Sequence, residues 1–279
     1  MTDLRSADGM RIFFTDLDGT LLNSRKKVTP ATRAALEAFT NAGGHFVIST
    51  GRALDSAQMV QRELDLFFPG TFLVGYNGAE IYDCDEQKVI RREPLGLDQV
   101  KIIFDLAAAC DVHVHTYEDN KILSSRNGEC MDYYRRVIKS PLRLVKDVPA
   151  EIRIPPCKCI SVELHDHEKQ ERYRLALKEA LGDSIVTLYS NPYYLEIFSP
   201  HAGKGSAVTW LCDYLQIPVE RSMAAGDEEN DISMIKAAGL GIAMCNGTDA
   251  VKAAADYITP RDNDHDGLTD ILLRQIKNT

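Results

Sequence analysis

A chain of 279 residues is long enough for one large domain or two smaller ones, because a single hydrophobic core stops growing at roughly 250 to 300 residues. Apolar residues make up 44% of the chain and charged residues 26%, which is typical of a globular protein and excludes a disordered one. The net charge of −9 disfavours binding to nucleic acid or to an anionic membrane, so an anionic ligand needs a local positive site.

The apolar runs, the first eleven residues and the cysteines indicate a cytoplasmic protein. No apolar run approaches the roughly 18 residues of a membrane span, and the first eleven residues lack the apolar middle of a signal peptide. Seven cysteines, an odd number, fit free thiols better than a disulfide framework. Cys157 and Cys159 are separated by one residue and lack a second pair, which favours core packing over a zinc site.

The first part of the chain alternates predicted strands and helices. Strands are predicted at residues 12–14, 46–48 and 72–74, and helices at residues 29–43 and 53–64, the first with Thr29 as N-cap and Pro30 in its first turn. Strands that alternate with helices predict a parallel sheet with right-handed crossovers.

The pattern changes after Gly78, where two short antiparallel strands are predicted. Up to about residue 199, further predicted helices and strands form an α+β insert, and the alternation of helix and strand resumes at Gly203. We therefore predict an α/β fold, with a Rossmann-like core and parallel sheet formed by residues 1–86 and 200–279, and an inserted α+β cap domain at residues 87–199.

Polar residues follow the predicted strands of this core. Asp16 and Asp18 come directly after the first strand, at the sheet edge where ligands bind in open α/β sheets. Two carboxylates separated by one residue can serve one centre if the chain curls there, and Gly19 gives the backbone that freedom. Alone, this pattern is equally typical of a polar turn.

Three other sites follow the same rule. Residues 49–52 place a hydroxyl and a helix-start amide after the second strand, although alone they read as an N-cap. Lys204 stands at a helix start, where the helix dipole disfavours a cation, which indicates an anion nearby; the alternative is a solvated surface lysine. Residues 226–231 are either a capping loop or a metal site, in which Asp227 and Asp16 supply the carboxylates that Mg2+ prefers.

Together and in this order, the motifs FTDLDGTLL, ISTGR, YNGAEIYD, GKG, GDEENDISMI and AMCNGTDAVKAAADYIT resemble the haloacid dehalogenase-like (HAD) superfamily, and within it the Cof-type phosphatases with a type-two cap. The resemblance spans Phe13 to about Leu268. It implies the HAD-like fold and Mg2+-dependent hydrolysis of small-molecule phosphate monoesters, such as sugar phosphates, through an aspartyl-phosphate intermediate.

The resemblance also implies roles for single residues. Asp16 is the nucleophile, ionised beside Mg2+, and Asp18 is the general acid and base, with a pKa that is raised when substrate is bound. Mg2+ is assigned to the Asp16 carboxylate, the Asp18 main-chain carbonyl and Asp227, with Asp231 orienting this shell. The residues implied to bind phosphate are Leu17, Thr50, Gly51, Lys204 and Asn230.

Substrate contacts are less defined. Arg52 and Asn77 follow core strands and are candidates. His113, His115 and Tyr117 lie on one face of a predicted strand of the insert, and a solvated face is slightly favoured over contact with substrate. The loop with Asp262, Asp264 and Asp266 imitates the start of a calcium site, but position twelve is Leu273 instead of an acid, so we predict a loop that caps the last helix.

Two other functions stay open. A phosphosugar mutase would use the same aspartyl-phosphate and return the phosphoryl group to sugar. A non-catalytic regulator that binds metal or ligand could also use this fold, although the four residues Asp16, Asp18, Lys204 and Asp227 disfavour it. We expect a monomer that acts on a small phosphate ester, without nucleic acid or membrane as partner.

Overall fold

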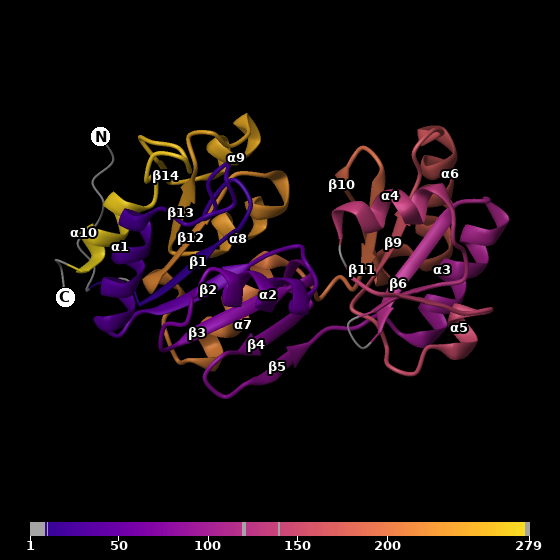
Figure 1. Cartoon of the computed structure of the whole chain (residues 1–279), viewed down its shortest axis with the longest axis horizontal. Helices are drawn as coiled ribbons and strands as arrows, with labels where there is room; N and C mark the ends of the chain where they lie inside the picture. The colour runs from indigo at the N-terminus through magenta and orange to yellow at the C-terminus, as the bar shows by residue number, and fades with distance from the viewer. Residues whose placement is uncertain (1–8, 10, 119–120, 139, 277–279) are drawn as a thin grey trace. The chain divides into compact units, whose positions relative to one another are not determined.

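The computed structural model describes residues 9, 11–118, 121–138 and 140–276. The chain divides into two compact units, one containing the residues up to Arg91 and from Gly203 onward, the other Arg92–Ala202 (Figure 1). Among the described residues, none of the helices has the length and apolar character that crossing a bilayer requires.

The first unit is built on an eight-stranded sheet in the order β14-β13-β12-β1-β2-β3-β4-β5. The strands are β1 (Ile12–Thr15), β2 (His45–Ser49), β3 (Thr71–Gly75), β4 (Glu80–Asp83), β5 (Lys88–Arg92), β12 (Ser222–Gly226), β13 (Leu240–Ala243) and β14 (Tyr257–Ile258). The neighbours from β14 through β3 pair in parallel, and β4 pairs antiparallel with β3. The predicted α/β fold with a parallel sheet is therefore confirmed.

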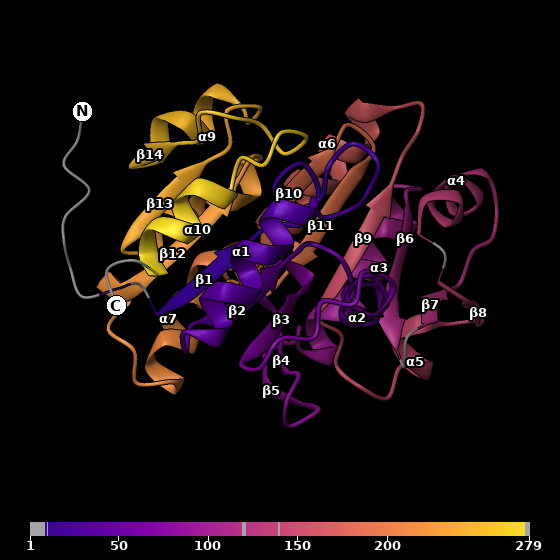
Figure 2. The same ribbon diagram turned by 60° about the vertical axis from the view of Figure 1, so that its left-hand side comes forward.

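Helices cover both faces of this sheet. They are α1 (Pro30–Asn41), α2 (Leu54–Glu63), α7 (Lys204–Tyr214), α8 (Ile232–Ala237), α9 (Asp249–Ala254) and α10 (Thr269–Ile276). Ile12 and Phe14 of β1 share a core with α7 and α8, whereas Phe13, on the opposite face by alternation, stacks on Phe46. Figure 2 shows α1 and α10 side by side, joined by a hydrogen bond of 3.1 Å between the hydroxyls of Thr32 and Thr269. Burial on both faces explains why β1 is apolar without alternation.

The second unit contains a six-stranded sheet in the order β10-β11-β9-β6-β7-β8. The strands are β6 (His113–Glu118), β7 (Lys121–Ser124), β8 (Leu142–Leu144), β9 (Lys158–Val162), β10 (Val186–Asn191) and β11 (Tyr194–Phe198). The helices are α3 (Leu97–Ala109), α4 (Glu129–Val137), α5 (Val148–Glu151) and α6 (His167–Leu181). Apolar side chains of α3 and α6 pack with those of β6, β9 and β11 in one core.

The preferred interpretation of His113, His115 and Tyr117 as a solvated face is wrong. All three side chains are buried, and Tyr134 of α4 contacts His115 and Tyr117. Its ring centroid lies 4.4 Å from that of His115, and its hydroxyl forms a short hydrogen bond with the Tyr117 hydroxyl. A single strand cannot reveal that a helix from elsewhere in the chain covers its second face, because amphipathic alternation reports only side-chain direction.

All seven cysteines are free thiols. Cys157 and Cys159 are both buried, and Cys159 belongs to the core between the sheet and α3 and α6. Among the described residues, the group of His, Cys, Asp and Glu that could hold a metal lies elsewhere and contains no cysteine. Core packing therefore accounts for Cys157 and Cys159.

Candidate active site

The polar residues predicted to lie together follow three adjacent strands of the first unit. Asp16 follows β1, Thr50 follows β2 and Asp227 follows β12, and β1 lies between the other two strands. The ladder continues just past the strand ends, because the Asp16 N–H donates to the Ala225 carbonyl at 3.0 Å. Parallel pairing therefore brings the three residues to one edge of the sheet.

Three carboxylates converge at this edge. Asp16, Asp227 and Asp231 are buried, and one oxygen atom from each lies within 4.8 Å of the others. Hard cations such as Mg2+ prefer carboxylate oxygens, so this cluster could hold a metal ion. Asp231 enters it from the turn Glu229–Asp231, which precedes α8.

Lys204 supplies a positive charge inside this cluster. Its side chain is fully buried, and Nζ lies 2.5 Å from Asp16 Oδ1 and 2.6 Å from Asp231 Oδ1. Burial disfavours the ammonium, but the charges of Asp16 and Asp231 outweigh it and raise the pKa of Lys204 above its ordinary value. The position of Lys204 at a helix start indicated a nearby anion. The structure shows two, the carboxylates of Asp16 and Asp231.

The carboxylates are short of positive charge. Burial raises the pKa of Asp16 to about 7, although Lys204 opposes the rise, and burial raises the pKa of Asp227 to about 6 against the hydrogen bond from Thr20. Three buried carboxylates share one lysine. A divalent cation among them would favour their ionised forms, so the donor set fits a metal such as Mg2+.

Asp231 fixes the loop that presents Asp227. Its Oδ2 accepts hydrogen bonds from the backbone N–H groups of Asp227 at 3.0 Å and Glu228 at 3.1 Å, while its Oδ1 binds Lys204. Both oxygens of Asp231 are therefore engaged, which suits a residue that orients the cluster.

Close packing requires a glycine beside Asp227. Gly19 has φ of +85°, and a Cβ there would lie 2.2 Å from Asp227 Oδ2. Thr20, the next residue, donates its hydroxyl to Asp227 Oδ1 at 2.5 Å. The turn after β1 therefore positions a carboxylate that comes from β12. Leu17, in the same turn, has a buried side chain, so only its backbone is suited to contact a ligand.

The second strand end meets the loop after β3. The backbone N–H of Asn77 donates to the Thr50 carbonyl at 3.0 Å, and the Asn77 side-chain oxygen accepts from Asn230 Nδ2 at 3.2 Å. A Cβ on Gly51 would lie 3.0 Å from that same oxygen. Tyr76 and Asn77 both have positive φ, 50° and 54°, a strained conformation that costs on the order of 1 kcal/mol or more per residue. This turn brings Asn77 between Thr50 and Asn230.

Asp18 is in a different environment from Asp16. Its carboxylate accepts hydrogen bonds from Arg52 Nη2 at 2.8 Å and from Lys26 Nζ at 2.7 Å. Burial alone would raise the pKa of Asp18, but Lys26 and Arg52 together hold it below its ordinary value. The raised pKa expected for the substrate-bound form stays a prediction.

Lys26 and Thr20 were missed by sequence reasoning. Thr20 is part of the DLDGT motif but had no role assigned to it, and its contact with Asp227 spans 207 positions of the chain. Lys26 stands in a polar run with two other cations, Arg25 and Lys27, and no spacing signal distinguishes it from them.

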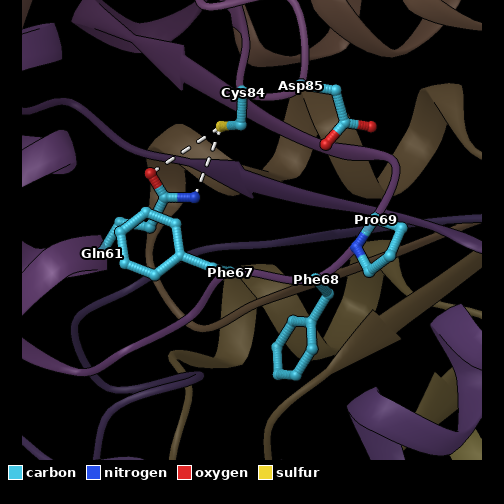
Figure 3. Close-up of a pocket in the computed structure, with 6 residues that line it drawn as sticks. All are labelled: Gln61, Phe67, Phe68, Pro69, Cys84 and Asp85. Carbon is cyan, nitrogen blue, oxygen red and sulfur yellow. Dashed lines mark hydrogen bonds between the residues drawn. The ribbon is translucent and has the colours of Figure 1, made fainter.

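The pocket in Figure 3 is not part of this site. It has a volume of about 360 Å³ and is lined by Gln61, Phe67, Phe68, Pro69, Cys84 and Asp85. Pro69 shortly precedes β3, so the pocket lies at the amino end of that strand, whereas Asp16 and Thr50 follow the carboxyl ends of theirs. The Cys84 sulfur accepts a hydrogen bond from Gln61. Burial raises the pKa of the Cys84 thiol to about 11, which makes it a poor nucleophile.

Comparisons with known proteins identify the family. The model of the haloacid dehalogenase-like hydrolases matches residues 13–272. A 5-amino-6-(5-phospho-D-ribitylamino)uracil phosphatase of Bacillus subtilis, YcsE, is 28% identical over 250 residues, which cover 90% of each chain. A crystal structure of a haloacid dehalogenase-like hydrolase from Bacteroides thetaiotaomicron has a TM-score of 0.85 at 30% identity, covering 95% of this chain and 99% of that one.

A second protein of that organism, BT1666, described among phosphatases of this superfamily, has a TM-score of 0.83 at 25% identity and covers 99% of this chain and 98% of its own. These relatives bear the names of phosphatases and hydrolases, and the family model spans nearly the whole chain. The resemblance found in the motifs is thereby confirmed, and the protein is an enzyme, a phosphatase. The chain belongs to the haloacid dehalogenase-like hydrolases.

Proposed function

We propose that the enzyme hydrolyses small-molecule phosphate monoesters with Mg2+ and an aspartyl-phosphate formed on Asp16. The observation that supports this most is the position of Asp16, whose carboxylate contacts the buried Lys204 ammonium at 2.5 Å and lies within 4.8 Å of the Asp227 and Asp231 oxygens. Cationic groups beside the nucleophile offset the repulsion between a carboxylate and a phosphate, which is the main obstacle to attack by an anion.

The Asp16 carboxylate, the Asp18 main-chain carbonyl and Asp227 would hold Mg2+, and Asp231 would orient them. When bound, the ion neutralises negative charge on the phosphoryl group and on the carboxylates. The excess of buried carboxylates over Lys204 supports this assignment.

The first step forms a bond between an Asp16 oxygen and phosphorus and breaks the bond between phosphorus and the alcohol oxygen. Asp18 gives a proton to the departing alcohol oxygen. In the second step a water oxygen attacks phosphorus, Asp18 takes a proton from that water, and the bond from phosphorus to Asp16 breaks to release inorganic phosphate. The two steps together return Asp16 and Asp18 to their starting forms.

The phosphoryl oxygens need donors during both steps. We assign this role to the backbone of Leu17 and Gly51 and to the side chains of Thr50, Lys204 and Asn230. The contacts of Asn77 with Thr50 and Asn230 favour an ordered set of donors. Arg52, which contacts Asp18, and Asn77, which contacts Thr50 and Asn230, are our candidates for substrate contact.

The test is release of inorganic phosphate from a panel of phosphate monoesters, with Mg2+ and with a chelator. The Asp16→Asn variant should neither turn over nor become labelled by substrate phosphate, whereas Asp18→Asn should become labelled but turn over at least about 100-fold more slowly. Equal labelling of the two variants would contradict the assignment. Interconversion of two sugar phosphates without net phosphate release would identify a mutase, and no turnover on any ester would favour a non-catalytic regulator.

We also propose that the enzyme acts as a cytoplasmic monomer with a small ester as its ligand. The net charge of −9 supports the exclusion of nucleic acid and of anionic membranes as partners. Sedimentation of the full chain tests the monomer.

A further inference from the structure

Two cationic side chains converge on the carboxylate of Asp18. Lys26 Nζ lies 2.7 Å from Oδ1, Arg52 Nη2 lies 2.8 Å from Oδ2 and 3.1 Å from Oδ1, and Arg52 Nε lies 3.1 Å from Oδ2. Both oxygens of Asp18 are therefore already bonded to cations. We refer to Lys26, Arg52 and Asp18 as the exposed ion-pair cluster.

The exposed ion-pair cluster has an excess positive charge, because two cations share one carboxylate. The side chain of Lys26 is 64% exposed and that of Asp18 is 39% exposed, whereas the Lys204 side chain is fully buried. The excess charge thus lies on the solvent side of the site, in a chain whose net charge is −9. A local positive site of this kind attracts an anionic ligand.

The proposed reaction fixes which part of the substrate meets this charge. Phosphoryl transfer requires the attacking and leaving oxygens roughly in line, so the alcohol oxygen lies on the far side of phosphorus from Asp16. Asp18 exchanges its proton with that alcohol oxygen. The alcohol part of the ester therefore extends past Asp18, toward Lys26 and Arg52.

The turn that presents Lys26 is specifically ordered. Asn23 Oδ1 accepts from the backbone N–H groups of Arg25 at 3.0 Å and Lys27 at 2.9 Å, and the Lys26 N–H donates to the Asn23 carbonyl at 2.9 Å. Lys26 has φ of 56°, a left-handed conformation that costs a residue other than glycine roughly 1–2 kcal/mol. Lys26 and Lys27 are both exposed, and the turn directs Lys26 to Asp18.

We propose that Lys26, together with Arg52, selects phosphate monoesters whose alcohol part has a second anionic group, either a carboxylate or a second phosphate. This inference rests on the proposed function, because it requires attack by Asp16. The second anion replaces the Asp18 carboxylate as the partner of the Lys26 ammonium, which frees an Asp18 oxygen for the alcohol oxygen. A neutral alcohol part offers no such exchange, so its ester must break the ion pair without compensation.

The test compares esters that differ in this one group. The kcat/KM for 6-phosphogluconate should exceed that for sorbitol 6-phosphate, which has a CH2OH group in place of the carboxylate, by on the order of fivefold, the range of an exposed ion pair, and the ratio should fall as salt rises. A second pair, fructose 1,6-bisphosphate and fructose 6-phosphate, shows whether a phosphate serves as well as a carboxylate. Preference for the anionic member in either pair supports the inference.

Variants assign the preference to Lys26. Lys26→Gln should bring the ratio close to one, mainly through a higher KM for the anionic ester, and Lys26→Arg should restore it. Lys27→Gln is the matched control, because it removes the same charge from the same turn, and it should keep the ratio of the unmodified enzyme.

Three results would overturn the inference: equal kcat/KM within both pairs, a preference that Lys26→Gln leaves unchanged, or release of phosphate from 4-nitrophenyl phosphate but from none of the four sugar esters. Failure of the proposed function is distinguishable from these, because it would appear as no phosphate release from any ester, 4-nitrophenyl phosphate included.

Discussion

Removing the charge of Asp16 should stabilise the metal-free enzyme near neutral pH. Burial raises the pKa of Asp16 from 3.8 to about 7, and a pKa difference of one between the folded and unfolded states corresponds to about 1.4 kcal/mol. Because the folded-state pKa is raised, protonated Asp16 contributes to the free energy of unfolding. This contribution is fully present below the unfolded-state pKa and is lost as the pH rises through the folded-state pKa. Ionisation of Asp16 therefore lowers the free energy of unfolding by about 4 kcal/mol at about pH 8. At about pH 4 the residue is protonated in the folded state, and almost no stability is lost.

The assay is urea unfolding of the unmodified enzyme and of Asp16→Asn in chelator, between about pH 4 and about pH 8. Asparagine stands for the protonated acid, so the variant should gain stability relative to the unmodified enzyme as pH rises, up to about 4 kcal/mol. Comparing the two proteins at each pH cancels the titration of groups that are distant from Asp16, whereas Lys204, Asp227 and Asp231 are coupled to it.

Mg2+ should reverse this order. The ion binds the ionised carboxylates of the folded enzyme and stabilises it by mass action, whereas the variant lacks one ligand and gains less. A difference between the two proteins that stays constant over the whole pH range in chelator would refute the reasoning, because it would mean that Asp16 is not buried among the other acids.

Three single contacts lead to further predictions. Lys204→Met should lower kcat/KM by on the order of 100-fold or more, because it removes the buried cation beside the nucleophile, and steady-state kinetics would measure this. Gly19→Ala should raise the Mg2+ concentration needed for half-maximal activity, because its Cβ would displace Asp227; Gly43→Ala has the same φ of +85° but no atom within 4 Å, and should leave that concentration unchanged. His115→Phe should leave the free energy of unfolding in urea unchanged or raise it by about 1 kcal/mol, because both ring nitrogens of His115 are buried without a hydrogen-bond partner in the described structure. A large loss of stability would show that the imidazole is needed.

Local sequence signals predicted the elements that hold the acidic residues. The helix expected from Thr29 and Pro30 begins there as α1, with the Thr32 N–H donating to the Thr29 hydroxyl. The apolar run at residues 12–14 predicted a strand, and the structure has β1 there, central in its sheet. Because ligands bind at the carboxyl ends of such strands, the approach of Asp16 to Asp227 could be inferred from the sequence alone.

Other features depend on contacts that no local signal reports. Two strands of three and four residues, β8 and β7, are too short to show a period, and their parallel pairing joins segments on either side of α4. Residues 229–231 form a 3-10 turn ahead of α8, in which Asp231 is held by Lys204 and by two backbone N–H groups. Helix propensity cannot anticipate such tertiary bonds.

The two lysines of the site differ in what their burial permits. Lys204 is fully enclosed and bridges Asp16 and Asp231, so it cannot leave without exposing two unpaired buried charges, a loss of roughly 3–5 kcal/mol. Lys26 is largely exposed, and an exposed ion pair contributes only about 0–1 kcal/mol, so an incoming anion can replace Asp18 as its partner at little cost. A fixed cation suits the phosphoryl group, which every substrate shares, and an exchangeable cation suits the alcohol part, which differs between substrates. The buried charge of Lys204 can therefore serve catalysis, while the exposed charge of Lys26 serves the selection of substrates.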